Sequence, residues 1–318
     1  MNISVLGCGR WGSFLAWYMN KLGNHVVSYG PDDDIFRSLA ETRVNEYVRY
    51  PDEILLTADL RAAVQHGEII IISISSQQLR GFLSRVCAFP LADKKFILCM
   101  KGIEEGTGKR LSEVAVEAGI KKEQLAVWVG PGHIQDFVKG IPNCMVIDSY
   151  EPWLKRFLAN SFKSEIIRFY YGTDIIGTEF GAATKNIMGI VAGILDGMNY
   201  ASLKGPLMAR GAREVARLIK AMGGNELSAY GLCHLGDYEA TLFSKHSHNR
   251  MWGETYAKGG EFAKLAEGVA TARAVGNLAG RLGIEMPITG AVNTAIRDKL
   301  PPKEMIKLLF ERDITVEF

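Results

Sequence analysis

The chain has 318 residues, of which 47% are hydrophobic, and its 37 basic and 35 acidic side chains leave a formal net charge of +2. This charge balance gives no indication of a nucleic-acid partner or a membrane-surface partner. No apolar run approaches the ~20 residues that a membrane span needs. The length favours two domains, because single hydrophobic cores rarely grow past roughly 250–300 residues.

The N-terminus and the cysteines both suggest a reducing compartment. An apolar strand follows Met1 directly, with no basic segment before it, so we expect no signal peptide and a cytoplasmic location. The number of cysteines is odd and no two are spaced as Cys-x-x-Cys, so we expect neither a disulfide framework nor a metal site. They are Cys8, Cys87, Cys99, Cys144 and Cys233.

The first half of the chain alternates strand and helix patterns. The aliphatic, β-branched run Glu68–Ile74 is too short for a core helix and predicts a central parallel strand. Alternating strands and helices predict a Rossmann-type doubly wound parallel sheet. The other predicted strands are Ile3–Leu6, Val26–Tyr29, Lys95–Met100, Leu125–Gly130, Cys144–Ile147 and Ile166–Tyr170, and predicted helices include Trp11–Leu22, Gln77–Phe89 and Gly108–Ala118.

From about Thr173 onward the strand pattern disappears. The remaining chain predicts an all-α C-terminal domain. We therefore place an α/β domain at residues 1–172 and an all-α domain at residues 173–318. Its predicted helices are Asp174–Met198, Lys204–Met222, Phe262–Leu282 and Pro287–Asp298.

A glycine turn, Gly7-x-Gly9-x-x-Gly12, follows the first strand and opens the first helix. In a dinucleotide site, Gly7 permits the tight turn, Gly9 lets the backbone approach a pyrophosphate, and Gly12 allows close packing of helix on strand. The helix N-terminus offers N–H groups and a positive dipole end to the phosphates. The pattern therefore favours a dinucleotide site over a merely structural turn.

The segment after the second predicted strand bears on the choice between NAD and NADP. It contains Asp32, Asp33 and Asp34, and we expect no arginine at hand. Three carboxylates would repel a 2′-phosphate, so we expect NAD rather than NADP. The alternative is that these aspartates begin a solvated helix, since aspartate is common at N-caps.

Further motifs follow the glycine turn along the chain. They are Met100-Lys101-Gly102-Ile103-Glu104, Gly130-Pro131, Gly181-Ala182-Ala183-Thr184-Lys185-Asn186, Ala192-Gly193-Ile194-Leu195-Asp196-Gly197, Leu235-Gly236-Asp237, Ser247-His248-Asn249-Arg250, Glu267-Gly268 and Gly283-Ile284-Glu285-Met286-Pro287-Ile288-Thr289. Together with Trp11 in the glycine turn, this set resembles the bacterial type of NAD(P)-dependent glycerol-3-phosphate dehydrogenase. The resemblance covers nearly the whole chain, and the combination is far more specific than any one motif.

The resemblance implies an oxidoreductase in which residues 1–172 bind the dinucleotide and residues 173–318 bind the substrate and carry catalysis. It implies hydride transfer between NAD(P)(H) and the pair sn-glycerol 3-phosphate and dihydroxyacetone phosphate. The implied catalytic residues are Lys185, Lys101 and Asp237. Implied substrate contacts are Lys101, Gly130, Gly132, Asn186, Ser247, His248, Asn249 and Arg250. Implied cofactor contacts are Gly7, Gly9, Arg10, Trp11, Gly12, Lys101, Ile134, Leu265 and Glu267.

The surroundings of Lys185 support its role as the general acid/base. Oxidation of an alcohol needs a base, and a lysine can serve if desolvation lowers its pKa towards neutrality. Lys185 lies in the small, apolar stretch Gly181–Ile194, where a lysine is costly unless it is used or paired. Asp237 would pair with it and orient it. The alternatives are a snorkelling helix lysine and a helix-capping aspartate.

The predicted phosphate loop departs from the family pattern. Histidine stands at His248 where the family has an arginine, and a histidine holds phosphate less reliably than an arginine fork. Asn249 and Arg250 remain, and Lys204 or Arg210 would assist. The departure leaves open a different polyol phosphate, a phosphonate or a hydroxy acid as substrate. A catalytically silent nucleotide-sensing or interaction protein is a third alternative. We expect a homodimer, because an all-α second domain commonly supplies an apolar helical face.

Overall fold

The computed structural model describes residues 1–314, 316 and 317, and the chain divides into two units. The first comprises Met1–Met100 and Leu111–Thr173, and the second comprises Lys101–Arg110 and Asp174–Phe318. The sequence had placed residues 101–110 in the first domain. They belong with the second unit because Ile103 packs in its core and Arg110 forms a buried ion pair with Glu179 at 2.9 Å.

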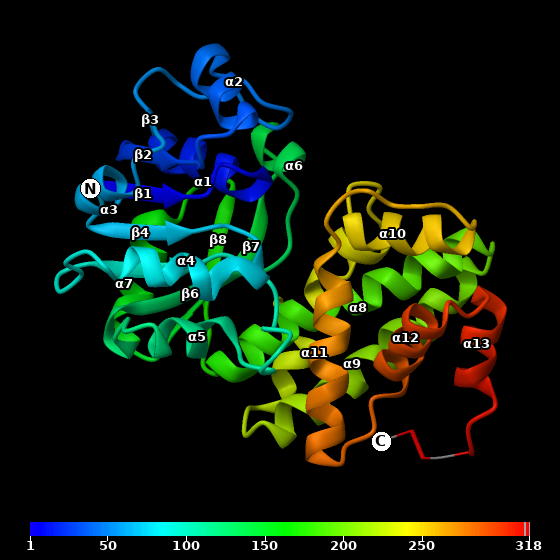
Figure 1. The fold of residues 1–318 in the computed structure, drawn as a ribbon. Helices are drawn as coiled ribbons and strands as arrows, with labels where there is room; N and C mark the ends of the chain where they lie inside the picture. The colour runs from blue at the N-terminus through cyan, green and yellow to red at the C-terminus, as the bar shows by residue number, and fades with distance from the viewer. Residues whose placement is uncertain (315, 318) are drawn as a thin grey trace. The chain divides into compact units, whose positions relative to one another are not determined.

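An eight-stranded sheet forms the centre of the first unit, in the order β3-β2-β1-β4-β5-β6-β7-β8 (Figure 1). The strand β4 consists of four buried isoleucines and lies between β1 and β5, as its aliphatic sequence predicts. The strands are β1 (Asn2–Leu6), β2 (His25–Tyr29), β3 (Leu55–Thr57), β4 (Ile69–Ile72), β5 (Lys95–Leu98), β6 (Leu125–Val129), β7 (Asn143–Ser149) and β8 (Ile167–Tyr171).

The strand β7 departs from the predicted all-parallel sheet. It runs antiparallel to β6, and β8 then pairs parallel to β7. The connection between β6 and β7 contains only the five-residue helix α6 (Ile134–Val138). Such a helix is about 7.5 Å long, whereas β6 spans roughly 16 Å. The helix by itself therefore does not carry the chain back along the sheet, and β7 returns in the opposite direction.

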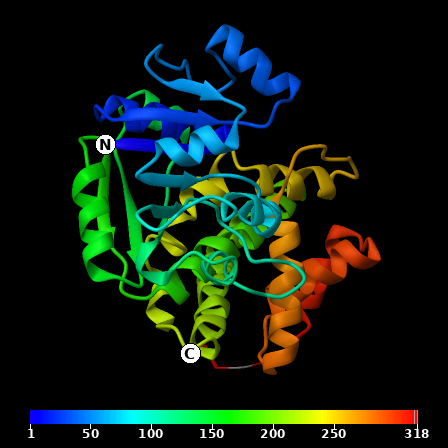
Figure 2. The same cartoon turned by 60° about the vertical axis from the view of Figure 1, so that its left-hand side comes forward.

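Helices cover both faces of this sheet, as Figures 1 and 2 show. Ile69 and Ile71 face a core that they share with side chains of α1, α6 and α7. Ile70 and Ile72 alternate to the opposite face, where α3, α4 and α5 pack in series. The helices are α1 (Arg10–Lys21), α2 (Asp34–Thr42), α3 (Leu60–His66), α4 (Leu79–Val86), α5 (Leu111–Glu117), α6 and α7 (Pro152–Phe162).

The second unit is built from helices around α8 (Ile175–Gly197), whose residues are almost all buried. Its other α-helices are α9 (Lys204–Ala221), α10 (His248–Ala257), α11 (Glu267–Leu282), α12 (Pro287–Asp298) and α13 (Pro302–Phe310). The predicted helix Phe262–Leu282 begins only at Glu267. The Asn249 side chain accepts the N–H of Gly268 at 2.9 Å and holds this first turn in place.

Three glycines of α8 let other elements approach its backbone. A Cβ at Gly193 would collide with the carbonyl of Arg250 on α10, and a Cβ at Gly197 would lie 2.6 Å from the Ala257 Cβ. A Cβ at Gly189 would lie 2.9 Å from the Thr241 side chain. This stripe allows α10, and the segment before it, to pack directly on α8. The close packing brings distant polar residues to the middle of α8.

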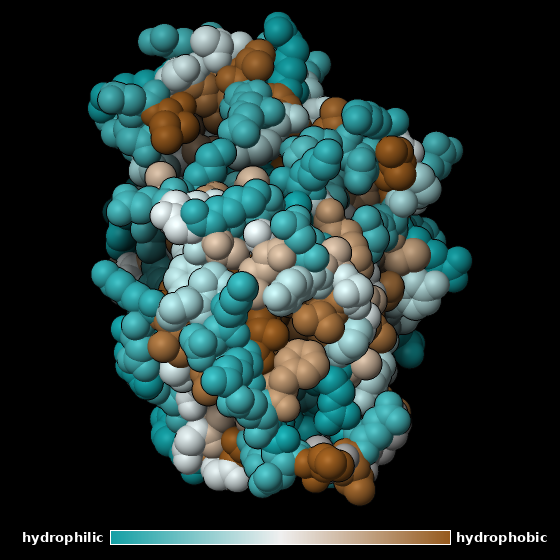
Figure 3. All heavy atoms as spheres, turned by 90° about the vertical axis from the view of Figure 1, so that its right-hand side faces the viewer, coloured by the Kyte–Doolittle hydropathy of each residue, from teal (hydrophilic) through white to brown (hydrophobic). Residues whose placement is uncertain are grey.

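The α9, α12 and α13 side of the second unit carries an apolar cavity of about 250 Å³, bordered by three arginines. In Figure 3, hydrophobic side chains gather among hydrophilic ones in the lower half of the face drawn. Within the described part of the chain, no helix combines the length and apolar character needed to cross a membrane.

Candidate functional site

The glycine turn of the first unit fits a dinucleotide. Gly7 has φ 115°, which favours glycine, and its missing side chain lets the turn lie against Ser73. A Cβ at Gly12 would collide with the carbonyl of Gly7, so close packing of α1 on β1 requires glycine there. A Cβ at Gly9, the N-cap of α1, would meet nothing within 4 Å. The turn therefore leaves open space in front of the helix N-terminus, as phosphate binding requires.

Other residues predicted to bind cofactor or substrate surround this turn within the first unit. Trp11 packs against Phe137 of α6, with ring centroids 6.3 Å apart, and Ile134 is buried beside them. Gly130 and Gly132 have φ of 134° and 142°, in the region that favours glycine. The guanidinium of Arg10 lies 6.0 Å from the centre of the Tyr47 ring.

The aspartates beyond β2 form a different arrangement from the predicted one. Asp33 caps α2 by accepting the N–H of Phe36 at 2.8 Å, which agrees with the alternative interpretation. Arg37 pairs with Asp32 at 2.8 Å and with Asp34 at 3.3 Å. The expectation that no arginine lies near these aspartates is therefore wrong. The first turn of α2 places the Arg37 side chain beside Asp32 and Asp34. The carboxylates alone no longer argue against a 2′-phosphate.

The three predicted catalytic residues lie together in the second unit. The Oδ2 atom of Asp237 is 2.8 Å from Nζ of Lys185 and 2.7 Å from Nζ of Lys101. Lys185 lies on α8, Lys101 begins the segment 101–110, and Asp237 ends the 3-10 turn η5 (Leu235–Asp237). Asp237 is 1% exposed, so one buried carboxylate holds both ammonium groups.

Thr241 completes this cluster and was missed by the sequence analysis. Its Oγ1 accepts a hydrogen bond from Lys185 Nζ at 2.6 Å and donates one to the Asp237 carbonyl at 2.7 Å. Thr241 lies in the π-helix η6 (Glu239–Phe243), a rare element that often marks functional sites. The sequence shows only that Thr241 follows Asp237 by four residues. That spacing does not indicate that Lys185 is the partner of Thr241.

Burial lowers the pKa of Lys185 to about 7. The nearby positive charge of Lys101 contributes to this lowering, whereas the carboxylate of Asp237 opposes it. Burial is the largest influence, so the net direction is downward. A lysine with this pKa exchanges a proton near neutral pH, which suits a general acid/base.

The two acceptors around Lys185 leave one position of its amine available for chemistry. A neutral amine has two N–H bonds and one lone pair. Asp237 and Thr241 can accept those two hydrogens, and the lone pair faces neither of these acceptors; the Lys101 amine is also close enough to hydrogen-bond with this nitrogen. When the amine is protonated, its third hydrogen takes that position and can be donated. Asn186, the next residue, donates to the Lys101 carbonyl at 3.3 Å and ties that segment to α8.

The predicted phosphate-binding residues form the start of α10. Ser247 caps this helix, and its hydroxyl accepts the N–H of Arg250 at 3.3 Å. The ring of His248 lies 3.3 Å from the carbonyl of Leu265 and packs against Phe262. The segment containing Leu265 and Glu267, both predicted to bind the cofactor, therefore lies beside His248 and Asn249.

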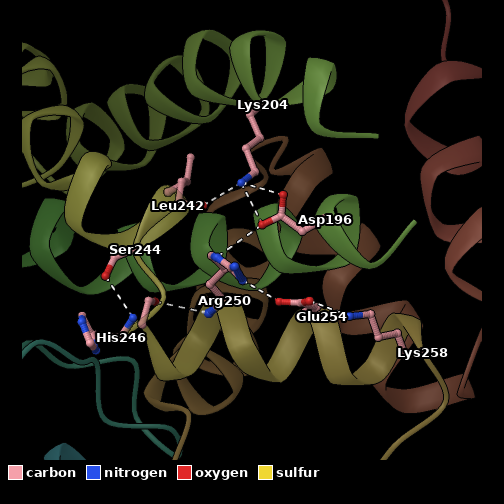
Figure 4. A network of polar contacts seen from close by, with 9 residues as sticks. Asp196, Lys204, Leu242, Ser244, His246, Arg250, Glu254 and Lys258 are labelled. Atoms are coloured by element: carbon pink, nitrogen blue, oxygen red, sulfur yellow. Dashed lines mark hydrogen bonds and ion pairs between the residues drawn. The ribbon is translucent and has the colours of Figure 1, made fainter. Parts of the chain in front are cut away.

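Arg250 belongs to a network of charged side chains drawn in Figure 4. Its guanidinium pairs with Asp196 at 3.3 Å and with Glu254 at 2.6 Å. Lys204 pairs with the same Asp196 at 2.7 Å and donates to the Leu242 carbonyl at 2.9 Å. Both cations thus face carboxylates that connect α8, α9 and α10. Arg210, the other suggested helper, donates instead to the Glu317 carbonyl at the α9 surface.

Comparisons with known proteins identify the family. Residues 2–154 match the family model for the N-terminus of NAD-dependent glycerol-3-phosphate dehydrogenase, and residues 174–307 match the model for its C-terminus. The chain belongs to the NAD-dependent glycerol-3-phosphate dehydrogenase family.

Individual relatives agree with this assignment. The chain is 35% identical over 331 residues to a glycerol-3-phosphate dehydrogenase (NAD(P)+) of Pelodictyon phaeoclathratiforme, covering 100% of this chain and 99% of the relative. It is 36% identical to the enzyme of the same name from Prosthecochloris aestuarii, covering 98% of each. The crystal structure of glycerol-3-phosphate dehydrogenase from Coxiella burnetii matches with a TM-score of 0.91 and 27% identity, covering 98% of each chain.

Family membership confirms the predicted fold class, the oxidoreductase activity of the NAD(P)-dependent glycerol-3-phosphate dehydrogenases, and NAD as cofactor. The same fold is seen in a Plasmodium falciparum glycerol-3-phosphate dehydrogenase, with a TM-score of 0.85 at 17% identity, covering 99% of this chain and 97% of that one. None of these relatives supports the alternative substrates that the change at His248 had left open.

Proposed function

We propose that this chain interconverts sn-glycerol 3-phosphate and dihydroxyacetone phosphate by reversible hydride transfer with NAD(H), with Lys185 as the general acid/base. The observation that supports this proposal most is the buried amine of Lys185, held between Asp237 Oδ2 at 2.8 Å and Thr241 Oγ1 at 2.6 Å. We assign most dinucleotide contacts to the first unit, and most substrate contacts together with proton transfer to the second.

In the oxidation direction, the neutral amine of Lys185 takes the proton of the substrate's secondary hydroxyl as its C–H hydride leaves. In the reduction direction, the ammonium of Lys185 gives that proton to the carbonyl oxygen. Bound NAD supplies the site that accepts the hydride, and NADH supplies the hydride for the reverse reaction. A pKa of about 7 allows Lys185 to serve both directions near neutral pH.

Lys101 and Asp237 have complementary roles in this proposal. The positive charge of Lys101 stabilises the oxyanion that develops on the substrate and keeps the Lys185 pKa low. Asp237 orients both amines through one oxygen atom. Asn186 binds the substrate beside Lys185, a role supported by its contact with the Lys101 carbonyl.

We assign the substrate phosphate to the first turn of α10, where Ser247, His248, Asn249 and Arg250 lie. The N-terminus of a helix attracts anions through its dipole and its N–H groups. Arg250 is already held by two carboxylates, so it contributes by fixing this turn and by its residual positive charge. His248 would contact the phosphate directly.

The remaining assignments concern the cofactor and the cell. We assign NAD contacts to Gly7, Gly9, Arg10, Trp11, Gly12, Lys101, Ile134, Leu265 and Glu267, and substrate contacts also to Gly130 and Gly132. We place the protein in the cytoplasm, where its free thiols are compatible with a reducing environment. We also propose a homodimer, which sedimentation equilibrium would reveal by a mass twice that of the 35.0 kDa chain.

The decisive experiment measures NADH oxidation with dihydroxyacetone phosphate and with a panel of unphosphorylated ketones. We expect turnover with dihydroxyacetone phosphate that exceeds every other ketone. In parallel, Lys185→Met should lower kcat by ~10²–10⁴-fold, the usual contribution of a positioned acid/base. Lys220→Met, a surface lysine of α9, serves as the matched control. The proposal is wrong if Lys185→Met keeps more than about a tenth of the wild-type kcat.

A further inference from the structure

A buried histidine lies next to the catalytic cluster, and the proposed reaction does not use it. His234 precedes the turn η5, is 0% exposed and packs edge-on against Tyr238, which is also 0% exposed. A polar ring in the core is costly unless its nitrogen atoms are hydrogen-bonded. Both ring nitrogen atoms of His234 have hydrogen-bond partners, and these partners determine which nitrogen carries the proton.

The contacts of His234 fix its tautomer. Its Nδ1 lies 2.8 Å from the carbonyl oxygen of Gly181, which can only accept a hydrogen bond, so Nδ1 carries the proton. Its Nε2 lies 2.7 Å from the hydroxyl of Tyr238, which donates to it. Burial is the main reason that the pKa of His234 falls to about 4; the hydrogen bond to the Gly181 carbonyl and the charge of Asp237 oppose this lowering, and the charge of Lys185 contributes to it. The ring is therefore neutral near pH 7.

The first of these bonds reaches the backbone of the acid/base itself. In an α-helix, the carbonyl of residue i accepts the N–H of residue i+4, so the Gly181 carbonyl on α8 faces the amide of Lys185. The proton on Nδ1 of His234 is thus donated to the same carbonyl. The missing side chain of Gly181 permits this approach, because a Cβ there would lie 3.2 Å from the His234 Cβ.

The second bond reaches the segment that carries the partners of Lys185. Tyr238 directly follows Asp237, and Thr241 is three residues further on. The other side of the Tyr238 hydroxyl is closed by α9, where a Cβ at Gly211 would lie 3.0 Å from it. The buried carboxylate of Glu214, also on α9, is the charged group that acts on Tyr238 from that helix.

We propose that His234, together with Tyr238, is a positioning pair that locks the Asp237–Thr241 segment onto α8 at the level of Lys185. The pair fixes both hydrogen-bond acceptors of the Lys185 amine and excludes water from it. This inference rests on the proposed role of Lys185. It adds two residues that touch neither substrate nor cofactor but decide how the amine is held.

Four variants test the pair one bond at a time. His234→Asn places an amide N–H near the position of Nδ1 and keeps the bond to Gly181, whereas His234→Gln places an amide oxygen near the position of Nε2 and keeps the bond from Tyr238. His234→Leu removes both bonds at similar volume, and Tyr238→Phe removes the donor with little change of shape. The matched control is His66→Leu, since His66 also contacts a backbone carbonyl, that of His25 at 3.1 Å, but lies in the first unit.

The readouts are kcat for alcohol oxidation from pH 5 to 10, KM for NAD and thermal unfolding. We expect His234→Leu to lower kcat about 30-fold and to move the pH midpoint up by about one unit, because water entering the cluster relieves the desolvation of Lys185. His234→Asn, His234→Gln and Tyr238→Phe should each give smaller shifts in the same direction. The control and the KM for NAD should change less than twofold.

The outcomes separate this inference from the proposed function. If His234→Leu or Tyr238→Phe folds and keeps the wild-type kcat and pH midpoint, the pair only fills the core and the inference is wrong. Tyr238→Phe gives this answer even if the histidine variants do not fold. If instead Lys185→Met keeps its activity, the proposed function fails, whatever the His234 variants do.

Discussion

The hydroxyl of Thr241 lies 2.6 Å from Nζ of Lys185 and at the same time donates its proton to the carbonyl of Asp237 at 2.7 Å. The hydroxyl hydrogen is thus committed to the backbone, and the oxygen lone pairs point to the lysine. Because Asp237 Oδ2 takes a second hydrogen of the amine, Thr241 decides where the remaining lone pair is directed.

Thr241→Val should therefore lower kcat by about tenfold, the effect of losing one hydrogen bond of ~1–1.5 kcal/mol. The KM for dihydroxyacetone phosphate should change little, since the bond orients the amine rather than binding the substrate. Thr241→Ser keeps the hydroxyl and should restore most of the activity. Steady-state kinetics of the three proteins check this expectation. A Thr241→Val enzyme with wild-type kcat would show that the hydroxyl has no part in orienting Lys185.

Lys101 and Asp237 should shift the pH dependence in opposite directions. Oxidation needs the neutral amine of Lys185, so kcat for glycerol 3-phosphate oxidation should rise with pH around a midpoint near 7. Lys101→Met removes a charge that lowers the Lys185 pKa, so the midpoint should move to higher pH. Asp237→Asn removes a charge that raises it, so the midpoint should move to lower pH. Equal shifts of both variants in one direction would contradict the charge arrangement.

The preference for NAD depends on Arg37 as well as on the aspartates. Arg37 pairs with Asp32 and Asp34, and because the loop still carries three carboxylates against this one cation, we expect kcat/KM to be higher for NADH than for NADPH. If NADPH is used at all, Arg37 is the residue that can meet its 2′-phosphate. Arg37→Ala should then leave kcat/KM for NADH within twofold and lower it severalfold for NADPH. A wild-type enzyme that prefers NADPH would refute the expected NAD specificity.

His248→Arg tests the phosphate assignment. An arginine fork holds phosphate more firmly than an imidazole, so the KM for dihydroxyacetone phosphate should fall severalfold. His246→Arg adds the same charge two residues earlier, before α10 begins, and serves as the control. If the two variants lower KM equally, the gain comes from general attraction of the anion and not from a phosphate contact at position 248.

The glycine stripe of α8 makes a prediction about stability. Gly193→Ala places a methyl group where the carbonyl of Arg250 lies, so α8 and α10 must separate. We expect a loss of about 2 kcal/mol or more of unfolding free energy, in the range of overpacked cores. Gly280→Ala on α11 meets no atom within 4 Å and should be neutral or stabilising by ~0.5–1 kcal/mol. Chemical denaturation of both variants measures their free energies of unfolding. Equal values would show that the contact between Gly193 and the Arg250 carbonyl is not tight.

Some features of this protein followed from the sequence because their causes are local. The turn Gly7–Gly12 requires glycine for its own backbone and for the packing of α1 on β1, and the four isoleucines of β4 fit a strand buried on both faces. Lys185 could also be singled out from the sequence, because its apolar neighbours in α8 are adjacent in the chain. The resemblance to a known family added Lys101 and Asp237 to it.

Other features depend on contacts between residues far apart in the chain. Thr241 meets Lys185 across 56 residues because a glycine stripe lets η6 and α10 lie against α8. Residues 101–110 join the second unit because Arg110 and Glu179 pair across 69 residues. Composition and periodicity predicted the elements, and the family resemblance pointed to Lys185 as the acid/base; only tertiary packing decided which side chains surround this lysine.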